Sequence, residues 1–339
     1  MSTAIRFTGD GGELPASQVH DVLRERILVD GFDLVLDLDR SRGTHLVDLR
    51  DGTSYLDMFG FFASSALGMN HPALADDDAF RRELAAAAIN KPSNSDIYTV
   101  PMARFVETFA RVLGDPALPH LFFIDGGALA VENALKAAFD WKSRLNESRG
   151  LDPALGTKVL HLTEAFHGRS GYTMSLTNTE PGKVARYPKF DWPRIDSPYL
   201  ADGRDVEEAE RHALDQARRA FAENPSDVAC FIAEPIQGEG GDHHFRPEFF
   251  QAMEALCREN DASSSSTRCR PAAVSPEPPG RTSNWGCTRR RRVRQEDPGL
   301  RNHGRRQGGR DPRQRVRRQL ADQLDLGRNL TDMVPVPPD

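Results

Sequence analysis

The chain has 339 residues and a formal net charge of −6, which is enough length for one large domain or two ordinary ones. The charge is unevenly divided, because residues 262–339 hold seventeen arginines, eight acidic residues and no lysine, so that residues 1–261 are strongly acidic. No apolar run is long enough to span a bilayer and the N-terminus has no signal-peptide pattern, which argues against membrane and secreted classes and predicts a cytoplasmic location. Cys230 and Cys257 indicate buried thiols in a reducing compartment, not a disulfide framework or a metal site.

The first predicted elements are short strands followed by two helices. Apolar and polar residues alternate in residues 27–50, which predicts a small antiparallel hairpin pair that residues 55–58 continue. The alanine-rich residues 77–90 and the amphipathic residues 101–113 are predicted helices.

From residue 121 onward, a short apolar run, a loop and a helix follow one another repeatedly. Residues 121–124, 158–162 and 228–233 are predicted strands, and a helix is predicted from about residue 130 to 144. Short buried strands that alternate with helices predict an α/β fold, with a mainly parallel sheet covered on both faces. Ligands bind at the carboxyl ends of such strands, so the loops after these three strands are the candidate site.

The first of these loops precedes a helix and contains two glycines. Residues 122–142 read FFIDGGALAVENALKAAFDWK, and Gly126 and Gly127 stand where the helix begins. Unpaired N–H groups and the dipole at a helix start favour a phosphate there. The glycines are not followed by Lys-Ser/Thr and do not form GxGxxG, so a nucleotide is not favoured. The alternative is that the glycines only turn the chain.

The second loop contains an aromatic residue beside a histidine. Residues 161–177 read HLTEAFHGRSGYTMSLT, in which Phe166 can stack on a planar ring and Arg169 can grip a carboxylate. The alternative is that Phe166 belongs to the core and Arg169 is a surface charge.

The third loop is glycine-rich and carries two glutamates, Glu234 and Glu239, within CFIAEPIQGEGGDHHFRPEFF of residues 230–250. These carboxylates can act as acid/base groups, metal ligands or hydrogen-bond anchors. Adjacent His243 and His244 are weak support for zinc without a further spaced ligand pair, so no metal is predicted.

Taken together and in this order, the three segments resemble the class III aminotransferases of pyridoxal-phosphate fold type I. Their amino-acid sequences are similar to those of one branch, the L-lysine 6-aminotransferases of actinobacterial type. The resemblance extends from about residue 28 to 261, and MFGFFASSALGMNHP and KPSNSDIYT fit the family's substrate-side segments. It implies that residues 1–58 belong to a small domain and that residues 59–261 form part of the large cofactor-binding domain. Residues 262–339 are predicted to be an aberrant, disordered tail.

The resemblance assigns the cofactor, pyridoxal 5'-phosphate, to residues of all three loops. The backbone amides of Gly127 and Ala128 would bind its phosphate. Phe166 would stack on the pyridine ring with His167 beside it, and Glu234 would support the strand end near the ring.

The resemblance also implies substrates and an assembly. In the family, lysine gives its ε-amino group to the cofactor, leaving 2-aminoadipate semialdehyde, which cyclises to piperideine-6-carboxylate. The nitrogen then passes to 2-oxoglutarate and yields glutamate. Arg169 would bind the substrate carboxylate and Glu239 would be the switch residue that pairs with a C-terminal arginine. The family implies a homodimer whose sites lie at the dimer interface.

The sequence after Asp261 departs from the family pattern. The family continues with segments like ALLIFDEVQTG and, later, FGKKTQVCG, which carry the aspartate facing the pyridine nitrogen and the lysine that forms the Schiff base. Written in GC-rich codons and shifted by one base, DALLIFDEVQTG becomes DASSSSTRCRPA, which is the sequence of residues 261–272. A further shift of the reading frame converts PDVVAFGKKTQVCG into a sequence like that of residues 289–301. We therefore interpret residues 262–328 as out-of-frame translation.

This interpretation leaves no catalytic residue to assign. The place of the aspartate falls near Thr267, and the place of the Schiff-base lysine falls near Glu296 and Asp297. We therefore expect the fold to be incomplete at the C-terminus and the chain as written not to transaminate.

Two alternatives to a lysine 6-aminotransferase stay open. One is another class III enzyme, acting on ornithine or 4-aminobutyrate. The other is a nucleic-acid-binding protein, suggested by the arginine runs of residues 289–294 and 313–318. No aromatic residues are interleaved with these arginines and no RNA-binding motif is present, so neither nucleic acid nor membrane is predicted as a partner.

Overall fold

The computed structural model describes residues 14–61, 64–92, 94, 96–114 and 119–266, and these form two compact units that divide after Asn90. The division differs from the boundary predicted after residue 58. The N-terminal unit extends beyond residue 58 because Gly43 and Met69 exchange two backbone hydrogen bonds, of 2.7 and 2.8 Å. The Asn70 amide also donates to the Leu38 carbonyl at 2.6 Å. Residues 67–70 are thereby tied to the N-terminal unit.

The N-terminal unit contains few strands. Its elements are the 3₁₀ turn η1 (Ala16–Gln18), α1 (Val19–Arg24), β1 (His45–Val47), β2 (Ser54–Leu56), α2 (Pro72–Ala75) and α3 (Asp78–Asn90). The predicted helix of residues 77–90 is confirmed as α3. The predicted hairpin pair is confirmed in part, because β1 and β2 pair antiparallel and isolated antiparallel bridges join Leu36 to Asp48 and Arg42 to His45. The Asp37 N–H donates to the Val47 carbonyl at 2.8 Å, and its carboxylate accepts from the N–H groups of Asp39 and Arg40, which ends the pairing in a turn.

The second unit holds the sheet and the longer helices. Its elements are α4 (Val100–Leu113), α5 (Gly127–Ser148), β3 (Lys158–Leu162), α6 (Thr173–Leu176), α7 (Pro181–Val184), β4 (Arg194–Ile195), α8 (Val206–Glu223), β5 (Val228–Ala233), β6 (Ile236–Gln237), β7 (His243–His244), α9 (Pro247–Glu259) and β8 (Ser263–Ser266). The helices predicted over residues 101–113 and 130–144 correspond to α4 and α5, and the strands predicted over residues 158–162 and 228–233 are β3 and β5.

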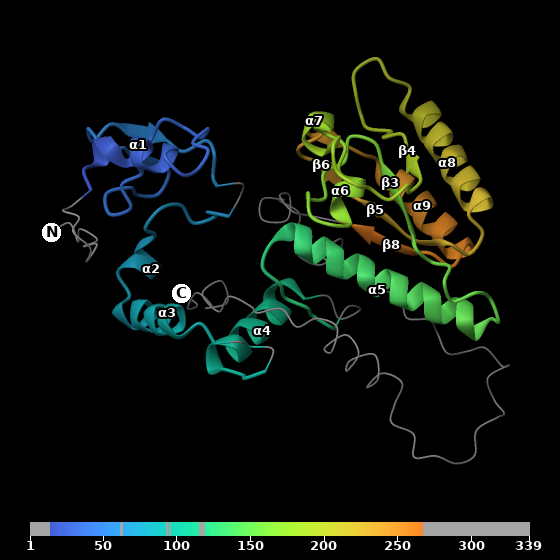
Figure 1. The fold of residues 1–339 in the computed structure, drawn as a ribbon, viewed down its shortest axis with the longest axis horizontal. Helices are drawn as coiled ribbons and strands as arrows, with labels where there is room; N and C mark the ends of the chain where they lie inside the picture. Colours follow the sequence, from blue (N-terminus) through green and yellow to red (C-terminus); the bar gives the residue numbers. More distant parts are fainter. Residues whose placement is uncertain (1–13, 62–63, 93, 95, 115–118, 267–339) are drawn as a thin grey trace, which may run out of the picture. The chain divides into compact units, whose positions relative to one another are not determined.

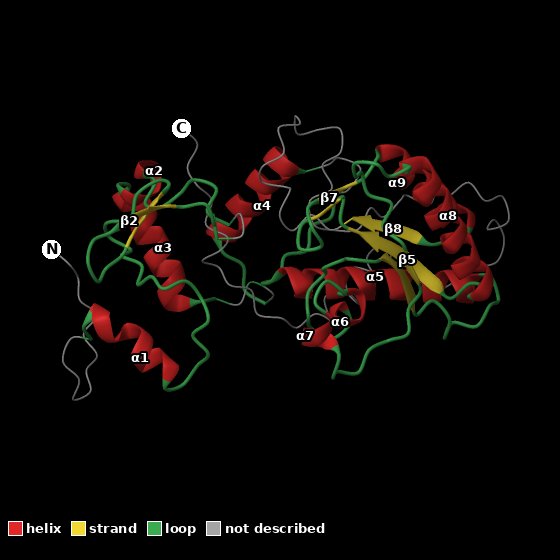
Figure 2. Cartoon of the chain, turned by 90° about the horizontal axis from the view of Figure 1, so that it is seen from above, coloured by secondary structure: helices red, strands yellow, loops and turns green. Residues whose placement is uncertain are grey.

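Four of these strands form a parallel sheet in the order β4-β3-β5-β8. Figure 1 shows α5 along one face of the sheet and α8 and α9 on the other, and Figure 2 shows the same layers from above. The predicted α/β class, a mainly parallel sheet with helices on both faces, is confirmed. The carboxyl ends of β3 and β5 therefore lie side by side at one edge.

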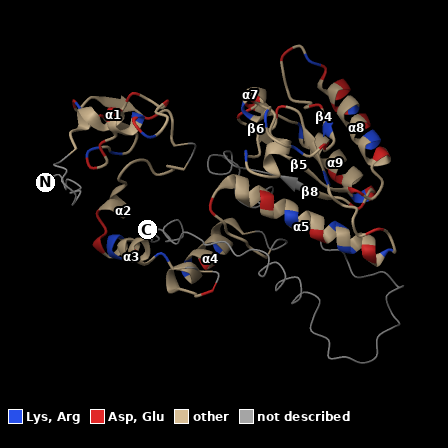
Figure 3. Cartoon of the chain, in the orientation of Figure 1, with Lys and Arg blue, Asp and Glu red and all other residues tan. Residues whose placement is uncertain are grey.

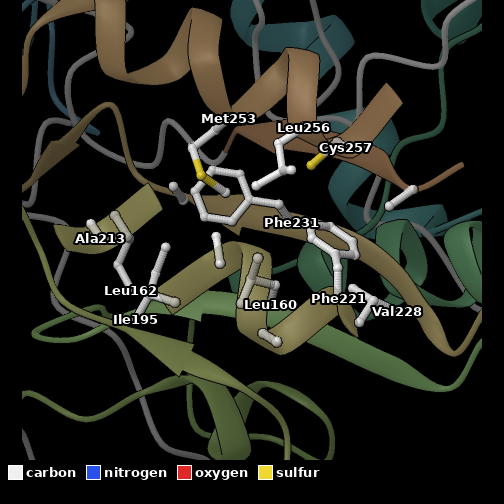
Figure 4. Close-up of a cluster of buried hydrophobic side chains, with 14 of the residues drawn as sticks. Leu160, Leu162, Ile195, Ala213, Phe221, Val228, Phe231, Met253, Leu256 and Cys257 are labelled. Atoms are coloured by element: carbon white, nitrogen blue, oxygen red, sulfur yellow. The ribbon is translucent and has the colours of Figure 1, made fainter. Parts of the chain in front are cut away.

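Strand alternation explains why both faces of this sheet are covered. Leu160, Leu162 and Phe231 pack against α8 and α9, in the cluster drawn in Figure 4. Val159 and Ile232 point to the opposite face and pack against α5. A strand that is buried on both sides reads as a continuous apolar run, and every residue of β5 is buried.

The outer helices carry many charged residues, of which Lys142 and Glu210 are buried. Figure 3 shows acidic and basic residues interspersed along α5 and α8. Helix α8 begins where the Asp205 carboxylate accepts a hydrogen bond from the Glu208 N–H at 2.9 Å, with Glu207 and Glu208 in its first turn. This N-cap and the acidic first turn stabilise the start of the helix.

Residues 121–124 were predicted to be a strand, and that prediction is wrong. The described structure contains no strand at these residues. Phe123 packs on α4, where its ring lies 4.9 Å from the ring of Phe105 and 5.2 Å from that of Phe109, centroid to centroid. Aromatic packing thus satisfies the apolar run without a place in the sheet.

The sheet continues into the segment that we assigned to the tail. Residues 263–266 form β8, which pairs in parallel with β5, Cys230 opposite Ser263 and Ala233 opposite Ser266. Its start is fixed by Lys142 at the far end of α5, whose buried ammonium donates to the carbonyls of Asn260 and Asp261 at 3.2 and 2.9 Å.

The remainder of the predicted tail, residues 267–339, lies outside the described residues, and so do the predicted places of the aspartate and of the Schiff-base lysine. None of the helices in the described part is long and apolar enough to cross a membrane.

Candidate functional site

The three predicted loops meet at the carboxyl edge of β3 and β5. The Phe166 N–H, in the loop after β3, donates to Glu234 Oε2 after β5 at 2.9 Å. The same loop contacts the first turn of α5, because Gly168 lies against Ala128. Residues 122–142, 161–177 and 230–250 therefore lie together, and the parallel order of β3 and β5 accounts for the meeting of the last two.

Helix α5 begins at this site with a turn that suits an anion. Gly126, the N-cap, has a φ of +90°, and Gly126 and Gly127 are both exposed. The first N–H groups of a helix have no acceptor within the helix, and they lie at the positive end of its dipole. The N–H groups of Gly127 and Ala128 are thus available to a phosphate.

The loop after β3 is held tightly against this turn. Gly168 has a φ of +113°, and a Cβ built on it would lie 2.5 Å from the Ala128 Cβ and 2.9 Å from the Ala128 Cα. Only glycine allows this approach at this backbone conformation. Two residues further on, Ser170 Oγ donates to Glu132 Oε1 at 2.7 Å, which is a second link between the loop and α5.

Phe166 and His167 occupy different environments in this loop. Phe166 is half-buried, and the Arg169 guanidinium carbon lies 5.8 Å from its ring centroid. The His167 N–H donates to Thr177 Oγ1 at 2.9 Å, and the Thr177 hydroxyl donates to the Gly168 carbonyl at 2.6 Å. His167 is only 4% exposed, and burial lowers the pKa of its imidazole to about 4. Its ring is therefore neutral at neutral pH.

The two predicted substrate residues are exposed and lie on separate loops. Arg169 lies beside Phe166, and its guanidinium is 3.7 Å from Glu180 Oε2. Glu239 lies in the exposed turn between β6 and β7. Glu234, by contrast, is buried at 9% exposure and anchors the Phe166 N–H. The cofactor residues are thus brought together with Arg169, whereas Glu239 is presented on the turn beside them.

His243 has a structural environment that the sequence does not reveal. Its ring is stacked on Tyr199 with centroids 3.6 Å apart, and its Nδ1 is 3.1 Å from Gln237 Oε1 and 3.4 Å from Glu164 Oε2. Within the described ranges, no three His, Cys, Asp or Glu side chains are placed to hold a metal ion.

The donors at the start of α5 and the Phe166 ring fit the phosphate and the ring face of the predicted cofactor, and four of the lysines make other contacts. The sequence holds six lysines, and the last is Lys189. Lys158 starts β3 and Lys142 contacts the residues before β8, so both lie at the opposite edge of the sheet. Lys183 pairs with Glu180 at 2.6 Å, and Lys189 donates to the Val184 carbonyl at 2.6 Å.

Sequence reasoning missed the residues that fix the loops to one another. Glu132 and Ser170 carry the contact between loops, Gly168 allows the close approach, and Thr177 holds His167 and Gly168 within their own loop. Their only signal in the sequence was their position within two segments that had already been singled out.

Comparison with known proteins places this site in a family. The family model described as aminotransferase class-III matches residues 29–263. The match ends close to Ala262, where the composition of the chain changes.

Individual relatives agree with this match. An L-lysine-epsilon aminotransferase of Mycobacterium bovis is 70% identical over 248 residues, which cover 72% of this chain and 55% of that protein. The enzyme of the same name from Streptomyces clavuligerus is 62% identical over 260 residues, covering 75% of this chain and 56% of that protein. A solved lysine aminotransferase from M. tuberculosis matches with a TM-score of 0.74 and 67% identity, over 75% of this chain and 59% of that one. The chain spans about half the length of the curated relatives it matches.

Proposed function

The chain belongs to the class III aminotransferase family, and on this premise we propose that it derives from an L-lysine 6-aminotransferase whose cofactor is pyridoxal 5'-phosphate. The reaction transfers the ε-amino group of lysine to 2-oxoglutarate, giving 2-aminoadipate semialdehyde and glutamate. The observation that carries the proposal is the convergence of three loops at one sheet edge, in a chain 62–70% identical to enzymes of that name.

The proposed cofactor site uses a helix start for the phosphate and a loop for the ring. The N–H groups of Gly127 and Ala128 would hold the phosphate, since they are the first donors of α5. Phe166 would cover one face of the pyridine ring, next to the neutral His167. Glu234 holds the Phe166 backbone and so orients that ring face. When bound, the cofactor supplies an electron sink, and the protein supplies orientation and charge.

The proposed substrate site uses Arg169 for the carboxylate of lysine or 2-oxoglutarate. A guanidinium binds a carboxylate through two parallel hydrogen bonds, which orients the substrate. Glu180 approaches the same guanidinium at 3.7 Å, so a substrate carboxylate would compete with it. Glu239, on its exposed turn, is the proposed switch residue.

We propose further that this chain, as written, does not carry out the reaction. The family needs an aspartate for the pyridine nitrogen and a lysine for covalent attachment of the cofactor. The place of the aspartate would fall near Thr267 and that of the lysine near Glu296 and Asp297, and no lysine follows Lys189 in the sequence. A homodimer and a cytoplasmic location remain predictions that follow from the family.

Binding and turnover by the purified full chain test these proposals separately. Titration with pyridoxal 5'-phosphate, followed by tryptophan fluorescence, is expected to show saturable binding that free phosphate competes away. Incubation with lysine and 2-oxoglutarate is expected to yield no glutamate above a protein-free control. Absence of saturable cofactor binding would contradict the proposed site, and glutamate formation at an enzymatic rate would contradict the proposed inactivity.

A repaired protein tests the substrate. Replacing residues 262–339 by the family sequence, continued to the C-terminal end of the longer relatives, restores both missing groups and the C-terminal arginine, and the repaired protein is expected to transaminate lysine in preference to ornithine and 4-aminobutyrate. Preference for either of the other two amines would assign the chain to a different branch of the family.

A further inference from the structure

Helix α5 and the loop after β3 are joined by a hydrogen-bonded chain whose direction can be worked out. The Ser170 N–H donates to Thr173 Oγ1 at 3.0 Å, so this oxygen acts as an acceptor. Ser170 Oγ lies 2.7 Å from Glu132 Oε1 and 3.1 Å from Thr173 Oγ1. A carboxylate only accepts, so the Ser170 hydroxyl proton goes to Glu132 and the Thr173 hydroxyl donates to Ser170. The chain runs from Thr173 through Ser170 to Glu132.

The surroundings of this chain of hydrogen bonds hold it in place. Thr173 is fully buried, and Glu132 and Ser170 are half-buried. A Cβ on Gly171 would lie 3.3 Å from Glu132 Oε1 and 3.5 Å from its Oε2, so the loop backbone lies against the carboxylate. Bonds to a charged acceptor away from bulk water are stronger than bonds between neutral groups.

The chain of hydrogen bonds connects the two parts of the proposed cofactor site. Glu132 is on the second turn of α5, whose first turn holds the phosphate donors Gly127 and Ala128. Ser170 is on the loop that carries Phe166 and His167. The Glu132–Ser170 bond therefore fixes the ring face relative to the phosphate donors, although neither residue is assigned a contact with the cofactor.

We propose, resting on the proposed function, that Glu132 is a positioning residue that acts through Ser170. It sets the separation between the phosphate donors and the ring face, so it governs affinity for the pyridine ring and leaves affinity for phosphate nearly unchanged. A residue that only stabilised the fold would not distinguish the two ligands.

The test compares two ligands on the full chain. Dissociation constants for pyridoxal 5'-phosphate are measured by tryptophan fluorescence, and those for inorganic phosphate by competition against it. Glu132→Ala is expected to weaken pyridoxal 5'-phosphate about tenfold and inorganic phosphate less than about twofold, because one charge-assisted hydrogen bond is lost. Glu132→Gln is expected to stay within about threefold of the original chain, since its amide oxygen accepts from Ser170.

Two further variants make the test independent of folding losses. Ser170→Ala should weaken pyridoxal 5'-phosphate about as much as Glu132→Ala, and the double variant should be no weaker than either, because both remove one bond. Glu147→Ala, which removes an exposed carboxylate from the far end of α5, should change neither constant. Circular dichroism establishes that each variant is folded.

The outcomes separate this inference from the proposed function. If the original chain does not bind pyridoxal 5'-phosphate, the proposed function and this inference both fail. If it binds, but Glu132→Ala weakens both ligands equally or neither, or if the Ser170→Ala effect adds fully to it, only the positioning role is overturned.

Discussion

Replacing Gly168 by alanine should strongly destabilise the protein, because it combines backbone strain with a steric overlap. The φ of +113° strains an alanine by about 1–3 kcal/mol. The new Cβ would also lie 2.5 Å from the Ala128 Cβ and 2.9 Å from the Ala128 Cα, and relieving such an overlap costs about 1–3 kcal/mol more. We therefore expect Gly168→Ala to lower the free energy of unfolding by about 4 kcal/mol.

Two other glycines separate these contributions. Gly150 has a φ of +71° but nothing within 4 Å of a built Cβ, so Gly150→Ala should cost only the conformational strain, about 1–2 kcal/mol. Gly182 has neither a positive φ nor a neighbour within 4 Å, so Gly182→Ala should be close to neutral.

Urea unfolding followed by tryptophan fluorescence measures all three variants, since Trp192 is 8% exposed in the cluster on the α5 side of the sheet. The expected order of destabilisation is Gly168→Ala, then Gly150→Ala, then Gly182→Ala. A Gly168→Ala variant that is no less stable than Gly150→Ala would show that the loop after β3 does not press on α5, and the reasoning about the site would fail with it.

The remaining predictions concern pH, a buried ammonium, a carboxylate and a chemical label. His167 has a folded pKa of about 4 and an ordinary pKa of about 6.5, so the unfolded state binds more protons between these values and stability is lost as pH falls from 6.5 to 4. In urea unfolding, His167→Asn should reduce the change of the unfolding free energy with pH between these two values by about 1.4 kcal/mol per pH unit. An unchanged pH dependence would contradict burial of a neutral ring. Lys142→Met should lower the free energy of unfolding by about 2 kcal/mol, because the Asn260 and Asp261 carbonyls lose their donor, and a neutral effect in the same assay would count against this contact. Glu234→Ala should weaken binding of pyridoxal 5'-phosphate about tenfold, because it leaves the Phe166 N–H without its acceptor. Glu234→Gln should weaken binding less. Equal affinities of Glu234→Ala and the original chain would argue that the contact does not matter for binding. Borohydride treatment of the protein with pyridoxal 5'-phosphate should leave no stoichiometric label on a single lysine in peptide mass spectra, and such a label would contradict the absence of an attachment lysine.

The sheet and the position of the site could be predicted because their signals are local. β3 and β5 are short apolar runs bounded by turn residues, and both match their predicted ranges. Parallel pairing then places their carboxyl ends together, so the loops bearing Phe166 and Glu234 were expected at one edge. The Phe166–Glu234 hydrogen bond is the direct consequence.

Other features depend on contacts that a linear pattern does not contain. Residues 121–124 have the composition of a strand, but the rings of Phe105 and Phe109 offer Phe123 an alternative partner. The segment 27–50 alternates like a strand pair and does pair antiparallel at Leu36 and Asp48, but the Asp37 carboxylate forms a turn directly afterwards and keeps the pairing short. The Glu132–Ser170 bond joins residues 38 positions apart, which only the folded chain brings together.

The Lys142 contact has a consequence for the order in which the protein folds during synthesis. Its acceptors lie 118 and 119 residues further along the chain, so they leave the ribosome long after α5 is complete. Until then the ammonium has to stay hydrated, because burying it without acceptors is unfavourable. The far end of α5 can therefore dock on the sheet only when residues 260–261 arrive, which makes this docking a late, long-range folding step. A nascent chain that stalls before residue 260 would expose the apolar face of α5 to chaperones and proteases.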